Sequence, residues 1–366
     1  CRIDPFGEGP KAGACGATAD TIASRDMARA TAAGSASHSD HARDLAITLI
    51  AIGKGETQGS TIRDPFKLKT IAAEFGIDTK DKKNTDIALQ LGQKVLEEFG
   101  KQEGELVFAQ RAPKKQKDIW HKQGVFPRGI DREVVETLSR THEGMDQEYK
   151  NLVQTTMRVA LADGWGGSMI ATELSDIIFG SPQPIRGRAN LGVLKEDEVN
   201  VIIHGHEPTL ADVIITAAQD KELLELAKTH GAKGINVAGI CCTANEMLVR
   251  RGLPVAGNFL QQELAIMTGA IEVMVVDIQC IMPGVTQAAK HFHTKVISTS
   301  PKASIPGAEV ILFHEDKVLD TAKQIIKIAI DNYKKRDRSR INIPKVSMEL
   351  VAGFTAENIF YHLGGK

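Results

Sequence analysis

The sequence predicts a multidomain α/β protein, with an N-terminal helical domain followed by Rossmann-like parallel α/β structure in one or more domains. Up to about residue 180, apolar residues recur at three- and four-residue spacings, which is the helical period. From about residue 195, short β-branched runs alternate with helical stretches, an order typical of a parallel, doubly wound sheet. A chain of 366 residues is long enough for two or three domains.

The first half is expected to be helical because amphipathic stretches follow one another, with alanine-rich sequence between them. Helices are expected over residues 20–33, 40–52, 65–75, 86–99 and 132–162. The glycine-rich stretch 164–167 should break one helix, and another should occupy residues 169–179. No strand is expected before about residue 195. Two prolines within residues 181–184 predict a boundary, which gives a helical domain over residues 1–185.

The second half is expected to contain five strands and the helices that connect them. The strands are expected at residues 199–203, 235–240, 271–278, 295–299 and 310–313, followed by an amphipathic helix over residues 316–335. A Rossmann-like domain is therefore expected over residues 186–343. Residues 344–366 are expected to start a third domain that is cut short.

Composition excludes some classes of partner. The net charge is −1, the sequence pI is about 6.9, and 25% of the residues are charged, so nothing indicates a nucleic-acid or anionic-membrane surface. The apolar runs are far shorter than the roughly 20 residues that span a bilayer. No signal-peptide pattern is visible, so we expect a cytoplasmic protein. Because the first residue is Cys1, we expect the true start to lie upstream, with a lipid-modified N-terminus as the alternative.

The five cysteines have positions that indicate ligands rather than disulfides. They stand at positions 1, 15, 241, 242 and 280, and an odd count with an adjacent pair argues against a disulfide framework in a chain of this length. A structural alternative exists for each one, because a free cysteine is often a small buried hydrophobe.

Three successive expected strands end in metal-type ligands. The first runs into His204 and His206, the second into Cys241 and Cys242, and the third into Cys280. Because loops that leave the same edge of a parallel sheet converge in space, we expect these side chains to share one site. Thiolates with an imidazole bind iron–sulfur clusters, zinc or copper. A mononuclear zinc site with a fourth ligand or water stays open at this stage.

Within this set, His206 is the preferred imidazole ligand because it lies nearer the loop than His204. Whether His204 or Cys241 also binds metal is left open by the sequence. Further upstream, Cys1 and Cys15 enclose a stretch rich in glycine and proline that can wrap closely around an inorganic cluster. Two cysteines are too few for a four-iron cluster, so the remaining ligands are expected before residue 1.

A histidine pair in the helical half suggests proton transfer. His38 and His41 are three residues apart and should share one face of a helix. Imidazole changes charge near neutral pH, so the pair can act as a proton relay or as an acid and a base. The alternative is that both are ordinary, partly exposed helix histidines.

Six segments together resemble the nickel-containing carbon monoxide dehydrogenases of anaerobes, within the hybrid-cluster or prismane-like superfamily. They keep the order of that family along nearly the whole chain: CRIDPFGEGPKAGACGATADTI, AAGSASHSDHARD, ADGWGGSMIATELSDIIFGSPQP, VIIHGHEPTLAD, GINVAGICCTANEMLVRRGLPVAGNFLQQELAI and VMVVDIQCIMPGV. The resemblance implies a helical domain followed by Rossmann-like domains, which agrees with the change of period near residue 190.

The resemblance also implies roles for individual residues. Cys1 and Cys15 match the last two ligands of an electron-relay [4Fe-4S] cluster, and the metal ligands His206, Cys242 and Cys280 match ligands of the active-site nickel–iron–sulfur cluster (Ni-4Fe-4S). His38 and His41 match residues of the proton path, and Asp163 is a candidate to support them. Asp44 stands where family members often have a further histidine, so the path can differ here.

The implied activity is the reversible oxidation of carbon monoxide with water to carbon dioxide, two protons and two electrons, which pass to a ferredoxin-type acceptor. The resemblance further implies a homodimer and allows an acetyl-CoA synthase subunit as partner. Other cluster ligands and a catalytic lysine of the family have no match here, so the 366-residue polypeptide alone is expected to be inactive. The alternatives are a truncated non-catalytic remnant and a relative of the hybrid-cluster hydroxylamine reductases.

Overall fold

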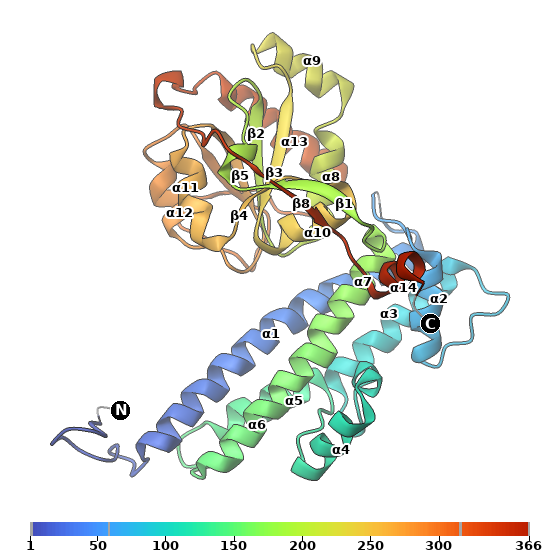
Figure 1. The fold of residues 1–366 in the computed structure, drawn as a ribbon, viewed down its shortest axis with the longest axis vertical. Helices are drawn as coiled ribbons and strands as arrows, with labels where there is room; N and C mark the ends of the chain where they lie inside the picture. Colours follow the sequence, from blue (N-terminus) through green and yellow to red (C-terminus); the bar gives the residue numbers. More distant parts are fainter. Residues whose placement is uncertain (1–2, 58, 315–316, 365–366) are drawn as a thin grey trace. The chain divides into compact units, whose positions relative to one another are not determined.

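The computed structural model describes residues 3–57, 59–314 and 317–364, which form two compact units (Figure 1). The first comprises Cys1–Gly55 and Asp64–Ile178, and the second comprises Glu56–Arg63 and Phe179–Lys366. The expected α/β class, with helices first and a mostly parallel sheet second, is confirmed. The finer domain boundaries at residues 185 and 343 stay predictions. In the part of the chain that is described, no helix is long and apolar enough to cross a membrane.

The first unit is a bundle built around one long helix. Its helices are α1 (Ala19–Lys54), α2 (Pro65–Glu74), α3 (Asn84–Gly100), α4 (Lys114–Gln123), α5 (Ile130–Arg140), α6 (Tyr149–Ala162) and α7 (Ser168–Phe179). Helix α1 packs against α3, α5 and α6 (Figure 1). Small buried residues such as Ala32, Ser35 and Ser39 form its packing face, so neighbouring backbones approach closely.

The expected bounds of several helices are wrong in detail. The separate helices at residues 20–33 and 40–52 are one 36-residue helix, because Ser35 and Ser39 between them are buried against neighbours and no proline interrupts the stretch. The single helix expected over residues 132–162 is two, α5 and α6. Between them Gly144 takes a positive φ of 79°, and the Asp146 carboxylate accepts the Glu148 N–H, which stabilises a turn.

The glycine-rich stretch does not break the helix. Asp163–Gly167 forms a π-helical segment that continues α6 into α7. A side chain at Gly166 would lie 2.6 Å from Ile130 Cγ1, so glycine allows this segment to pack against α5. Asp163 lies in this segment, and π-helical segments occur frequently at functional sites.

The second unit contains an eight-stranded sheet in the order β7-β6-β5-β2-β3-β4-β1-β8, parallel except for the β1–β8 pair. The strands are β1 (Ile185–Ala189), β2 (Val199–Gly205), β3 (Ile235–Ile240), β4 (Val255–Gly257), β5 (Ile271–Val276), β6 (Lys295–Ser298), β7 (Glu309–Val310) and β8 (Met348–Ala352). The expectation of no strand before residue 195 is wrong, because β1 pairs with both β4 and β8. Its sequence, IRGRA, alternates arginine with small or apolar residues and lacks an apolar run.

Helices cover both faces of this sheet. The helices of the described part of this unit are α8 (Pro208–Ala217), α9 (Lys221–Thr229), α10 (Cys241–Arg251), α11 (Gln262–Met267), α12 (Gly284–Ala289), α13 (Val318–Tyr333) and α14 (Ala356–Leu363). Helices α10, α11, α12 and α13 pack directly against its strands. Val201 and Val273 point into one core, shared with α8 and α13, whereas Ile202 and Met274 point into the other, shared with α11 and α12. This two-residue alternation is that of strands buried on both faces.

The strand order determines where a ligand can bind. From β2 the chain proceeds to β3 and β4 on one side, and then to β5, β6 and β7 on the other side. The topological switch point therefore lies at the carboxyl end of β2. In open α/β sheets ligands bind in the crevice at this position.

Candidate metal centre

The carboxyl ends of β2, β3 and β5 are level with one another. His204 pairs with Ile240, the last residue of β3, and with Val276, the last residue of β5. Cys241 follows β3 directly and forms a parallel bridge with Gly205. The predicted ligands His206, Cys242 and Cys280 thus follow three adjacent strands at the switch point of the sheet. Their assignment as metal ligands stays a prediction.

The two histidines at the end of β2 differ in how well they are placed to bind a metal. His204 is 1% exposed, and its Nε2 lies 3.0 Å from Oε1 of Gln262. Desolvation lowers the pKa of His204, so the ring is neutral at pH 7. This ring nitrogen is already hydrogen-bonded to a buried amide, and whether His204 also binds metal stays an open prediction. His206 is the better candidate ligand.

The three cysteines at these strand ends have different environments. Cys241 is buried, and desolvation raises the pKa of its thiol to about 12. Cys242 and Cys280 are exposed, and desolvation by nearby protein atoms together with the charge of Cys280 raises the pKa of Cys242. Thiols of this kind ionise when a bound metal supplies positive charge. Cys242 and Cys280 are therefore the more accessible sulfur donors.

The backbone at these cysteines is unusual. Cys241, Gln279 and Cys280 have positive φ values of 65°, 60° and 56°, a region that non-glycine residues rarely adopt. Such backbone conformations cluster at active sites and ligand clamps, where the surrounding structure holds them in place. Cys241 follows β3, and Gln279 and Cys280 follow β5, so all three lie beyond the strands on either side of β2, at or next to the predicted ligands.

The donor types are compatible with a metal cluster, and the described residues form no ready single-ion site. Within the described ranges, no three His, Cys, Asp or Glu side chains are arranged to hold one metal ion, so a mononuclear zinc site receives no support. Ligands of an iron–sulfur cluster bind different metal atoms and need not converge on one point. Thiolate and imidazole are donors that such clusters use. A cavity of about 520 Å³, lined mainly by apolar atoms, lies beside this set at Cys241 and Asn245.

Two buried polar residues at this edge were missed by sequence reasoning. Gln262 is fully buried, accepts the N–H of Met282 and donates to the carbonyl of Phe259. Asp277 follows β5 directly, and its burial raises the pKa of its carboxyl to about 7, although hydrogen bonds from backbone N–H groups oppose this. The signal for Asp277 was an acidic residue at the end of an apolar strand, three residues before Cys280.

In the first unit, the structure brings together two of the residues predicted for proton transfer. His38 Nδ1 on α1 lies 2.8 Å from Asp163 Oδ1 in the π-helical segment. The hydroxyl of Ser168 donates to the same carboxylate oxygen over 3.3 Å. The hydrogen bond with Asp163 raises the pKa of His38, although desolvation and the charge of His41 oppose this. Asp163 thus stabilises the protonated form of His38.

His41 lies one helical turn after His38, close enough for its charge to lower the pKa of His38. A side chain at Gly167 would lie 3.1 Å from the Ser39 nitrogen and 3.3 Å from the carbonyl carbon of His38. The glycine therefore lets the segment that carries Asp163 approach the part of α1 that carries both histidines. The roles of His38, His41 and Asp163 in proton transfer stay predictions.

The loop before α1 has a fixed local structure. The Asp4 carboxylate accepts the N–H groups of Gly7, at 2.6 Å, and of Gly9, at 3.1 Å, and these bonds lower the pKa of Asp4. Cys15 is exposed in the turn between Ala12 and Thr18, which form an antiparallel bridge. Cys1, the other predicted ligand of the relay cluster, lies outside the described residues.

Comparison with known proteins identifies relatives of the whole chain. The model of the Prismane/CO dehydrogenase family matches residues 1–359. Carbon monoxide dehydrogenase 1 of Methanosarcina mazei is 52% identical over 366 residues, which are 100% of this chain and 58% of that protein. The nickel-free crystal structure of carbon monoxide dehydrogenase from Thermococcus sp. AM4 is 51% identical with a TM-score of 0.98, and the match covers 100% of this chain and 58% of that chain.

A third relative is a structure of acetyl-CoA synthase/carbon monoxide dehydrogenase, described with NiZn[Fe4S4] and NiNi[Fe4S4] clusters in its alpha subunits. It is 40% identical with a TM-score of 0.93, and the match covers 100% of this chain and 54% of that chain. The chain therefore spans somewhat more than half the length of the relatives that it matches. The chain belongs to the Prismane/CO dehydrogenase family.

Proposed function

We propose that this chain supplies the helical and cluster-binding parts of a nickel-containing carbon monoxide dehydrogenase. The observation that carries the proposal is the imidazole and two thiols at His206, Cys242 and Cys280, on three adjacent strand ends at the switch point of the sheet. The high identity to carbon monoxide dehydrogenase of Methanosarcina mazei along the whole chain supports it. The reaction is the oxidation of carbon monoxide with water to carbon dioxide, two protons and two electrons.

In this proposal His206, Cys242 and Cys280 contribute ligands to a nickel–iron–sulfur cluster. When bound, that cluster supplies the carbon monoxide binding, the activated water and the electron storage. The chain supplies donors at the carboxyl edge of its sheet. His204 is buried and neutral there, and an apolar cavity lies beside Cys241.

His38 is proposed to accept and release a proton of the reaction. Its Nδ1–H is directed to Asp163 Oδ1, which leaves Nε2 as the nitrogen that exchanges protons. The raised pKa of His38 keeps its protonated form available near neutral pH. His41 is proposed as the next member of the path, since it lies on the same helix one turn away.

Further proposals concern electron transfer and assembly. Cys1 and Cys15 are proposed to ligate a [4Fe-4S] relay cluster that passes electrons to a ferredoxin-type acceptor. A homodimer and a cytoplasmic location are proposed. An acetyl-CoA synthase subunit is proposed as a partner, which the match to an acetyl-CoA synthase/carbon monoxide dehydrogenase supports.

A chimaera tests the activity. This chain replaces the matching part of the Methanosarcina mazei relative, and the purified protein is assayed anaerobically for viologen reduction under carbon monoxide. We expect turnover, and its loss in Cys242→Ser. A soluble chimaera that contains nickel, iron and sulfide but oxidises no carbon monoxide would contradict the proposal. The 366-residue chain alone is expected to show no turnover in the same assay.

Elemental analysis of the chain separates the alternatives. Nickel with iron and sulfide supports the dehydrogenase, whereas iron and sulfide without nickel favour a hybrid-cluster reductase relative. Absence of all three after anaerobic reconstitution favours a non-catalytic remnant. The matched controls are Cys242→Ser and Cys280→Ser, which should lower the iron content if the metal is bound at the predicted site.

A further inference from the structure

Asp277 connects the segments that carry the predicted ligands. Its Oδ1 accepts the N–H of His206, at 2.6 Å, and the N–H of Ile278. Its Oδ2 accepts the N–H of Glu207 and the hydroxyl of Thr243, both at 3.1 Å. The carboxylate thus receives four hydrogen bonds from three segments that are far apart in sequence.

Each donor lies at or beside a predicted ligand. The first is the backbone of His206 itself, Thr243 is the residue after Cys242, and Ile278 lies two residues before Cys280. These segments follow β2, β3 and β5, respectively. Because one small, buried group is bonded to all three, their separations cannot change independently of one another.

The backbone next to Asp277 leaves room for its carboxylate because residue 205 is a glycine. Gly205 has a φ of 134°, and a side chain there would lie 1.6 Å from Asp277 Oδ1. No other residue type fits this position while the carboxylate stays in place. The glycine therefore serves the approach of Asp277 to the β2 loop.

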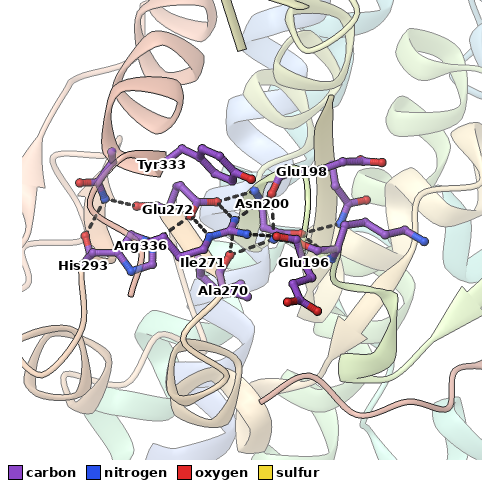
Figure 2. A network of polar contacts seen from close by, with 12 residues as sticks. Glu196, Glu198, Asn200, Ala270, Ile271, Glu272, His293, Tyr333 and Arg336 are labelled. Carbon is purple, nitrogen blue, oxygen red and sulfur yellow. Dashed lines mark hydrogen bonds and ion pairs between the residues drawn. The ribbon is translucent and has the colours of Figure 1, made fainter. Parts of the chain in front are cut away.

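A second buried carboxylate on the same strand shows the contrast. Glu272, at the opposite end of β5, is paired with Arg336 and His293 (Figure 2). Its side-chain partners, Arg336 and His293, are charged or titratable, and its Oε2 also accepts the N–H of Asn200 at the amino end of β2, away from the predicted ligands. The donors to Asp277 are three backbone N–H groups and one hydroxyl, which hold their positions and supply no compensating charge.

We propose that Asp277 is a positioning residue that ties the His206, Cys242 and Cys280 segments into one ligand set. A carboxylate is required because four donors need two acceptor oxygens, whereas an asparagine offers one oxygen and one competing N–H donor. The identity of the bound cluster rests on the function proposed above. The hydrogen bonds by which Asp277 holds the three segments together do not depend on that function.

The first test uses hydrogen exchange on the full, metal-free chain. Asp277→Asn should speed backbone exchange in all three segments, residues 204–207, 241–243 and 278–282, because the N–H of Glu207 then faces an amide donor. The matched control Glu272→Gln should speed exchange around residues 196–200, 270–272 and 332–336 and leave the three segments unchanged. Unchanged exchange at residues 204–207 and 278–282 in Asp277→Asn would overturn the tying.

The second test measures metal binding. Chains reconstituted anaerobically with ferrous iron and sulfide are compared for iron per chain and for the electron paramagnetic resonance spectrum. Loss of a residue that supports metal ligands typically lowers metal affinity about 10- to 100-fold, and we expect Asp277→Asn to fall in this range. Glu272→Gln should keep the wild-type spectrum even where its thermal stability is equally reduced. Equal iron affinity and an unchanged spectrum in Asp277→Asn would overturn the proposal.

Two further variants keep the outcomes distinct. Should Asp277→Asn not fold, Thr243→Val removes one donor alone and should shift the spectrum in the same direction by a smaller amount; a wild-type spectrum would then count against the proposal. If Cys242→Ser and Cys280→Ser load iron like the wild type, the proposed function fails. The exchange measurements would still decide whether Asp277 ties the segments.

Discussion

At the scale of single residues, the hydrogen bond with Asp163 is the largest influence on the pKa of His38, whose Nδ1 also lies 3.4 Å from the Ser168 hydroxyl. The Asp163 carboxylate fixes which ring nitrogen carries the proton and stabilises the imidazolium, as acidic partners of histidine generally do. The folded-state pKa of His38 is raised, so its contribution to stability is present below the ordinary histidine pKa and is lost as pH rises through the folded-state value. The side chain is 43% exposed, so this contribution is small.

Asp163→Asn is predicted to lower the pKa of His38, because the amide keeps a hydrogen bond but carries no negative charge. Titration of the His38 ring protons by nuclear magnetic resonance measures this. Ser168→Ala is the control, since it removes a neighbour of the carboxylate and leaves the charge; its effect should be smaller. A His38 pKa that is the same in Asp163→Asn and the wild type would show that the pair does not form in solution.

Gly205→Ala is predicted to destabilise the second unit strongly. The new methyl group would overlap the Asp277 carboxylate, and overpacking of this kind costs about 1–3 kcal/mol in addition to the strain of the positive φ. Gly231→Ala is the matched control, because Gly231 also has a positive φ, 86°, but has nothing within 4 Å of a new side chain. Calorimetry compares the two variants, and equal losses of stability would mean that the contact with Asp277 is relaxed in solution.

At the scale of elements, the local sequence pattern predicted those strands whose residues are apolar and buried along their whole length. The apolar runs of β2, β3 and β5 identified these strands, and parallel pairing then placed His206, Cys242 and Cys280 at one sheet edge. Strand β1 could not be predicted in this way, because its arginine-rich sequence is extended only through pairing with β4 and β8. Asp277 was missed for a similar reason: its partners come from other strands, and no spacing in the sequence indicates them.

Helix α5 carries an acidic cluster that makes the stability of the first unit depend on pH. Glu136 accepts hydrogen bonds from Arg128, Arg140 and Arg158. Burial would raise the pKa of this carboxyl, but Arg128 and Arg158 outweigh that effect and lower it to about 2. Because the folded-state pKa is lowered, the contribution to stability is full above the ordinary value of 4.5 and is lost as pH falls toward 2.

Glu136→Gln is therefore predicted to destabilise the first unit by about 1–2 kcal/mol at pH 7, allowing for solvent screening, and by less at pH 3. Urea unfolding followed by tryptophan fluorescence measures this selectively, since both tryptophans of the chain, Trp120 and Trp165, lie in the first unit. Lys94→Gln removes an exposed ion pair of α3 with Glu97 and should change little at either pH. A pH-independent loss in Glu136→Gln would indicate that packing, not charge, is what the variant disturbs.

At the scale of the whole molecule, the second unit has a buried ion pair at the amino ends of its strands and the predicted metal ligands at their carboxyl ends. At the amino end of β5, Arg336 Nη2 lies 2.6 Å from Glu272 Oε2 and donates to the carbonyl of Ala270, and Arg336 Nη1 donates to the carbonyl of Glu196 (Figure 2). These bonds fasten the segment after α13 to the sheet. At the carboxyl end of the same strand, Asp277 bonds to the three loops. Neither group shares a partner with the other.

This separation predicts that Arg336→Met loses stability without losing metal. The variant leaves the fully buried Glu272 without its guanidinium partner, and breaking a buried pair in this way costs about 3–5 kcal/mol. Glu272→Gln combined with Arg336→Met should be less destabilised than the sum of the two single changes, because the double variant buries no unpaired charge. At temperatures where the variants stay folded, iron and sulfide per chain should match the wild type. A parallel loss of iron would mean that the two ends of β5 are coupled through the sheet, and that the carboxyl edge is not held by Asp277 independently.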